Sequence, residues 1–132
     1  MESFFIKPSL DQWLAQAKAE PDSGKAGMFL FHNGVVRSTP RREAREGVTG
    51  LPSVRAIRFH YDGEKVLKAE TDTRAMPGVC YVRTWLNDGT LSVGEDLMLV
   101  LVGGDTRPHV IAALEYLVGR LKSECVSEEE LF

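Results

Sequence analysis

Four arginines lie close together in one polar stretch of the sequence. Arg37, Arg41, Arg42 and Arg45 are opposed there only by Glu43. The planar guanidinium fork matches phosphate and carboxylate oxygens, so the cluster is a candidate binding site for such anions. The same composition is also typical of a solvated loop, and the residues alone leave both interpretations open.

A second candidate lies at residues 103–107, where a predicted strand ends in two glycines and the last predicted helix begins. Backbone N–H groups at such a junction can hold an anion. Thr106 or Asp105 as a helix N-cap explains the same residues without a ligand. Lys122, near the end of that helix, is a third candidate, although a lysine there commonly complements the helix dipole.

The histidines and cysteines do not form a recognisable metal site or catalytic set. His32, His60 and His109 are scattered, and we expect them to be structural or exposed. Cys80 and Cys125 are 45 residues apart without metal-ligand spacing. We expect Cys80, in an apolar run, to be buried and Cys125 to be exposed, and we expect no bound metal.

The composition is that of an ordinary globular protein. The 132 residues are 43% hydrophobic and 27% charged with a net charge of −3, which fits one domain over residues 1–132 and gives no reason to expect a nucleic-acid partner. The longest apolar run, residues 97–102, is far shorter than the ~20 residues that cross a bilayer. No secretory segment follows Met1, so we expect a cytoplasmic protein without membrane association. The last nine residues hold four acids and no base, and we expect an exposed acidic tail.

Hydrophobic periodicity and turn residues predict the element order β-α-β-β-α-β-β-α. Strands are predicted at residues 4–6, 28–37, 54–61, 79–86 and 97–102, and helices at 9–20, 64–75 and 107–123. Residues 38–50 are predicted to be a long polar loop that carries most of the arginine cluster. The pattern indicates an α+β domain with a mainly antiparallel sheet and helices packed on one face of it.

Several short stretches, in order along the chain, resemble the large, catalytic subunit of molybdopterin synthase. The run from Met28 to Arg37 is similar to the F-x-G-x-V-R strand of that family, and residues 91–96 are similar to its L-x-x-G-[DE] turn. Residues 103–107 resemble its H-R junction, with Thr106 at the position of the histidine. The interval from Arg107 to Lys122 keeps the family's spacing between that arginine and a functional lysine.

The resemblance implies a molybdopterin synthase large-subunit-like fold, an α/β hammerhead, that forms a homodimer and acts in molybdenum cofactor biosynthesis. It implies a partner, a small ubiquitin-like sulfur-carrier subunit whose C-terminal Gly-Gly carries a thiocarboxylate. The large subunit transfers this sulfur to a cyclic pyranopterin monophosphate and so makes the dithiolene. No cofactor is implied for this step.

The resemblance also implies roles for individual residues. Arg37 and Arg107 would hold the phosphate or pterin of the substrate, and Lys122 would be the catalytic residue at the transfer point. Arg41 or Arg42, in the polar loop, could reach the same site. Arg107 and Lys122 are 15 residues apart on one predicted helix, about 22 Å at ~1.5 Å per residue. One pocket that uses both would therefore take them from two subunits of a two-fold dimer.

Two positions depart from the family pattern. Glu129 stands at the place of a second family lysine, and Thr106 at that of the histidine. An acid beside a phosphate site reverses the sign of an electrostatic contact. We therefore keep an alternative, a catalytically impaired homologue that binds a pterin, another anion or a ubiquitin-like tail as a dimer. An unrelated α+β enzyme or binding module is a third interpretation.

Overall fold

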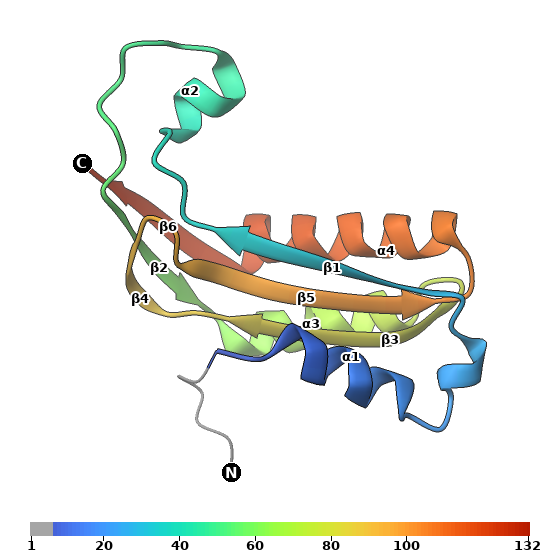
Figure 1. The fold of residues 1–132 in the computed structure, drawn as a ribbon. Helices are drawn as coiled ribbons and strands as arrows, with labels where there is room; N and C mark the ends of the chain where they lie inside the picture. The colour runs from blue at the N-terminus through green and yellow to red at the C-terminus, as the bar shows by residue number, and fades with distance from the viewer. Residues whose placement is uncertain (1–6) are drawn as a thin grey trace.

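The computed structural model describes residues 7–132 as two three-stranded antiparallel sheets with helices packed against them (Figure 1). This architecture confirms the predicted α+β class. The first sheet has the strand order β1–β5–β3 and the second β4–β2–β6. The strand predicted at residues 4–6 lies outside the described residues. In chain order the elements are α1 (Leu10–Lys18), the 3-10 turn η1 (Ser23–Lys25), β1 (Met28–Val35), α2 (Arg41–Glu46), β2 (Ala56–Tyr61), α3 (Gly63–Arg74), β3 (Val79–Leu86), β4 (Gly89–Ser92), β5 (Asp96–Gly104), α4 (Arg107–Arg120), the π turn η2 (Leu121–Cys125) and β6 (Val126–Leu131).

The central strand, β5, is buried because helices cover both faces of the first sheet. Val100 and Val102 belong to the core that includes α3 and α4, whereas Leu99 and Leu101 pack with Trp13 of α1 on the opposite face. A strand buried on both faces is hydrophobic at every position, as this segment of the sequence is. The expectation that helices cover one face is wrong, because α1 brings its own apolar side chains to the other.

The two glycines predicted to break β5 are in fact part of it. Gly103 pairs with Phe29 of β1, and a Cβ at position 103 would lie 2.6 Å from the Phe29 ring. A Cβ at Gly104 would lie 2.6 Å from the backbone oxygen of Gly78. Glycine is therefore needed here because neighbouring groups approach the strand closely.

The edge strand β1 is irregular at Gly34. Its register with β5 shifts between Gly34 and Val35. The first half of β1 is half-buried, since an edge strand has a neighbour on one side only.

The acidic C-terminal segment is not a free tail but an edge strand of the second sheet. β6 pairs antiparallel with β2, whose Phe59 is completely buried. Edge positions tolerate charged side chains because one side of the strand faces water. Glu129 lies directly opposite Arg58 and pairs with it at 2.7 Å.

The region predicted as a long loop contains a short helix. α2 spans six residues and ends at Gly47, which has a φ of 70°. Figure 1 shows α2 apart from the two sheets, on the side where β6 ends. Its residues are almost entirely polar, so it lacks the apolar stripe by which the longer helices are recognised.

We predict that Gly104→Ala destabilises the protein by about 1–3 kcal/mol, the usual cost of overpacking a core site. The new Cβ would meet a backbone carbonyl and the side chain of Val110. Gly24→Ala is the matched control, because within the described residues no heavy atom beyond its chain neighbours lies within 4 Å of a Cβ there. Urea midpoints measured by circular dichroism check this, and equal midpoints for both variants and the parent would contradict it.

Candidate functional site

A cavity of about 210 Å³ lies where the end of β1 meets α2, the π turn and β6. Its lining includes four cationic side chains, Arg37, Arg41, Arg45 and Lys122, against two carboxylates, Glu128 and Glu130. An adjoining hollow of about 330 Å³ shares Arg41, Arg45, Lys122 and Glu128 with it. The excess of positive charge in a protein of net charge −3 makes this cavity a candidate site for an anion.

Lys122 is exposed at the cavity because of the π turn that carries it. Leu121 and Cys125, at the two ends of the turn, are 0% and 3% exposed and anchor it in the core. The hydroxyl of Ser123 donates to the carbonyl of Gly119 at 2.8 Å. Single π turns occur often at functional sites. Helical periodicity alone predicted a helix through Ser123, so the widened turn was missed.

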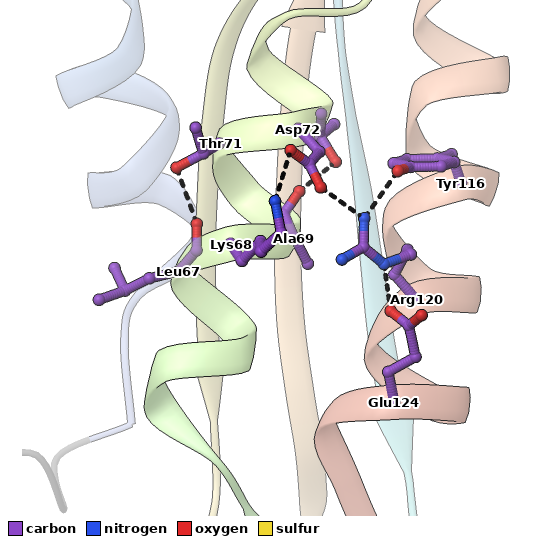
Figure 2. Close-up of polar contacts among 9 residues, drawn as sticks. Leu67, Lys68, Ala69, Thr71, Asp72, Tyr116, Arg120 and Glu124 are labelled. Atoms are coloured by element: carbon purple, nitrogen blue, oxygen red, sulfur yellow. Dashed lines mark hydrogen bonds and ion pairs between the residues drawn. The ribbon is translucent and has the colours of Figure 1, made fainter.

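The neighbouring Arg120 has a structural role instead (Figure 2). Its guanidinium donates to Asp72 of α3 at 2.8 Å and to the Tyr116 hydroxyl at 2.7 Å, and it also pairs with Glu124. The hydrogen bond from Arg120 holds the pKa of Asp72 below its usual value, and the hydrogen bond to Asp72 in turn raises the pKa of Arg120. This network ties the π turn to α3 and so fixes the base of Lys122.

The arginine cluster divides between the cavity and solvent. Arg37 lines the cavity and donates to the carbonyl of Thr39 at 3.1 Å. Arg41 and Arg45 both line it because they are four residues apart on α2 and so share one helix face. Arg42 lies outside the cavity lining and pairs with Glu46 at 3.5 Å, so the structure brings Arg41 to the cavity but not Arg42. Arg45 belongs to the arginine cluster noted in the sequence, and the helix α2, where a loop was predicted, places it beside Arg41.

Arg107 lies at the opposite end of α4 from Lys122 and is exposed, so one chain does not bring the two together. The junction before α4 carries a carboxylate of its own. The carboxylate of Asp105 accepts the N–H of Thr106 at 2.6 Å and pairs with His109 at 2.7 Å. The hydrogen bond with His109 holds the pKa of Asp105 below its usual value. A carboxylate of the protein itself therefore lies at this junction, although no side chain caps the first turn of α4.

Alternation along β6 decides which acids reach the cavity. Glu128 and Glu130 lie opposite the buried Phe59 and Ile57, on the cavity side of the strand. Glu128 pairs with the Arg41 guanidinium, and Glu130 accepts the backbone N–H of Arg41 at 2.9 Å. Glu129 faces the other way, toward Arg58. The expectation that Glu129 places an acid beside the anion site is therefore wrong, and its two neighbours take that place.

His32 is a cavity residue that the sequence analysis assigned to structural or exposed positions. Within residues 7–132 its Nε2 is buried without a hydrogen-bond partner. Burial and then the nearby charge of Lys122 lower its pKa. A polar side chain directly after the apolar run of residues 28–31, on the same predicted strand, was the signal that could have identified it.

Neither cysteine has the environment of a reactive thiolate. Cys125 is buried, contrary to expectation, and Cys80 is half-buried. Burial is the main cause that raises the pKa of both thiols. Within residues 7–132 no three His, Cys, Asp or Glu side chains are grouped to hold a metal ion, and no helix is long and apolar enough to cross a membrane.

Comparison with protein families matches residues 7–124 to the family described as MoaE protein. No curated protein matches the chain. Among solved structures, molybdopterin synthase from Staphylococcus aureus matches with a TM-score of 0.73 and 16% identity, over 100% of this chain and 93% of that one. The MoaE protein of Burkholderia ambifaria matches with a TM-score of 0.71 and 18% identity, over 96% and 81%. A complex of subunits 1 and 2 of the molybdopterin-converting factor from Helicobacter pylori matches with a TM-score of 0.66 and 16% identity, over 93% and 75%.

We predict that Glu128→Gln strengthens the binding of inorganic phosphate at low salt by up to about fivefold, which corresponds to the ~1 kcal/mol of a partly exposed ion pair. The change releases Arg41 and removes a negative charge from the cavity. Glu129→Gln, the matched control on the other face of the same strand, should leave the affinity nearly unchanged. Calorimetric titration at two salt concentrations measures both effects, and an equal gain in the two variants would contradict the assigned facing of β6.

Proposed function

We propose that this chain, which belongs to the MoaE protein family, is the large, catalytic subunit of a molybdopterin synthase. The family model matches residues 7–124 of the 132 and confirms the resemblance found in the sequence. It acts in molybdenum cofactor biosynthesis and passes sulfur from the thiocarboxylate of a small ubiquitin-like carrier subunit to a cyclic pyranopterin monophosphate. The product carries the dithiolene that later holds molybdenum.

The observation that carries this proposal is that Arg37 and Lys122, which lie far apart in the sequence, line one cavity. Arg37 supplies a planar fork suited to a phosphate. The Lys122 ammonium is a point charge on a flexible stem, and it stabilises the negative charge that develops on oxygen or sulfur during transfer. Among residues 7–132 no carboxylate forms an ion pair with Lys122, whereas Arg41 and Arg58 each pair with one carboxylate and Arg120 with two.

The partner we propose is a carrier subunit with a narrow Gly-Gly tail. A relative with a similar fold occurs as a complex of two subunits of a molybdopterin-converting factor, which supports a two-subunit assembly. The cavity and the adjoining hollow form a polar depression around Lys122 into which such a tail could reach.

We also propose that the protein forms a homodimer, because of the distance between two of its predicted site residues. Arg107 and Lys122 lie at opposite ends of α4. If both serve one substrate, Arg107 must come from a second copy of the chain, and a two-fold axis then creates two identical composite sites.

The alternative is a binding protein without catalysis. The observation in its favour is that Glu129, at the position of the second family lysine, is engaged by Arg58 and faces away from the cavity. Such a protein would bind the pterin or the carrier tail as a dimer and make no product.

We predict that Lys122→Ala abolishes dithiolene formation when the protein is reconstituted with a thiocarboxylated small subunit and the cyclic precursor. Its stability should change by less than about 0.5 kcal/mol, as for other exposed positions. Lys18→Ala, at the exposed end of α1, is the matched control and should retain full activity. Retained activity in Lys122→Ala would remove the residue from the mechanism. A stability loss of ~2–5 kcal/mol, the size of a core truncation, would make it structural. Inactive parent protein would favour the binding protein.

We predict that a mixture of Arg107→Ala and Lys122→Ala chains regains activity that neither variant has alone. In a mixed dimer with shared sites, one site receives both intact residues and the other neither. Activity is compared before and after subunit exchange, which native mass spectrometry monitors. No recovery despite complete exchange, or a monomer at micromolar concentration, would refute the shared site.

A further inference from the structure

We propose that His32 is a further anion-binding residue of the cavity, whose imidazole donates a hydrogen bond from Nε2 to an oxyanion held between Arg37 and Lys122. The inference rests on the proposed function, since it places that substrate phosphate, or the carboxylate end of the carrier tail, in this cavity. His32 thereby becomes a specificity-determining contact.

The position of His32 argues against a purely structural role. It lies on β1 opposite Val100 of the fully buried β5, and its ring lines the cavity with Arg37 and Lys122. Within residues 7–132 the buried Nε2 has no partner, so the protein itself gives this nitrogen nothing to bind. Buried polar atoms are nearly always hydrogen-bonded, and an exception at a cavity points to a missing ligand.

Gly34 leaves room for that ligand beside the ring. A Cβ at position 34 would lie 3.6 Å from Nε2 of His32 and 3.2 Å from Cγ of Met98. A side chain there would pack against this edge of the imidazole, and glycine keeps that group away from Nε2. His32 also stands at the first position of the F-x-G-x-V-R pattern, where phenylalanine would offer no hydrogen bond.

The groups that face His32 are mostly positive. The segment after β1 contributes Arg37, α2 contributes Arg41 and Arg45, the π turn contributes Lys122, β6 contributes Glu128 and Glu130, and β5 contributes the apolar Leu97 and Met98. A positive charge on the imidazole is unfavourable beside these cations when no anion is bound. It becomes favourable once an anion lies between the ring and the Lys122 ammonium.

Because of this change in sign, the binding of an anion is coupled to the protonation of His32. In the free protein, burial and then the charge of Lys122 lower the pKa of His32 below its ordinary value of about 6.5. A bound oxyanion stabilises the imidazolium and raises that pKa. By linkage the anion binds more tightly as pH falls through the raised value, and the gain levels off below the lowered value. A rise of one unit corresponds to about tenfold tighter binding at the low-pH limit.

The test is a pH titration of the histidine ring nitrogens by nitrogen-15 NMR, in the full chain with and without saturating sulfate. Sulfate keeps its double negative charge from pH 5 to 8 and stands for the phosphate. A second arm with N-acetyl-Gly-Gly, which ends in a carboxylate, stands for the carrier tail. We expect one or both probes to raise the pKa of His32. His60 and His109 are internal controls, because both are exposed and paired with Asp88 and Asp105, and they should not respond.

Two variants separate hydrogen bonding from charge. His32→Phe should bind the responsive probe more weakly at every pH and lose the pH dependence, yet melt at a higher temperature because it buries no unpaired nitrogen. His32→Gln keeps an N–H donor without a titrating ring, so it should recover the affinity seen at pH 8 but not the gain at low pH. Glu128→Gln should retain the pH dependence, which excludes that carboxylate as its source.

The inference is overturned if neither probe shifts the pKa of His32, or if His32→Phe binds both probes as the parent does at pH 5 and pH 8. These readouts need no sulfur transfer. A parent protein that makes no dithiolene product while its His32 responds to sulfate would refute the proposed catalysis and leave the anion contact standing. An active parent protein whose His32 responds to neither probe would refute the anion contact and leave the proposed catalysis standing.

Discussion

The antiparallel pairing of β6 with β2 is the interaction on which the candidate site depends. The chain passes from the end of α4 through the π turn Leu121–Cys125 directly into β6, so the turn sets where this strand begins. The two ends of the turn are buried, which leaves Lys122 on the outside between them. The same pairing sets the register of the acids, so that Glu128 and Glu130 meet Arg41 and hold α2 over the cavity. Without this ladder, the cations of the cavity would have no fixed relation to one another.

The cavity balances opposing charges rather than concentrating one sign. Four cationic side chains that share so small a space repel one another, and the two glutamates offset part of that repulsion. The same glutamates compete with any anionic ligand for Arg41. The affinity of the cavity is therefore a difference between the attraction of its cations and the displacement of its own carboxylates. Arg120 shows the contrasting case, in which a cation engaged with Asp72, Glu124 and Tyr116 serves to join helices (Figure 2).

The buried Nε2 of His32 has an energetic cost. A buried nitrogen without a hydrogen bond destabilises a protein by about 1–3 kcal/mol. Natural sequences tolerate such conflicts between local chemistry and stability chiefly at functional sites. The ring lies at the cavity that also holds Arg37 and Lys122, which is where such a conflict is expected.

Short-range patterns in the sequence were sufficient for most of the scaffold. Ser9 begins α1 as predicted, since a hydroxyl that accepts the N–H of Gln12 is a contact between near neighbours in the chain. The same holds for β5 and α4. The uniform apolar run of β5 and the amphipathic stripe of α4 show directly which residues of each segment are buried. The similarity of spaced motifs added Arg37 and Lys122, which the structure brings to one cavity.

Tertiary structure decided the rest. The strand β6 is acidic and has little strand propensity of its own, so it exists because β2 offers a ladder from a distant part of the chain. The facing of Glu129, the separation of Arg107 from the cavity and the place of His32 depend on register and on packing between distant segments. Local propensity depends on residues that are close in the sequence, whereas a functional site is formed by residues that are close in space and often distant in the sequence.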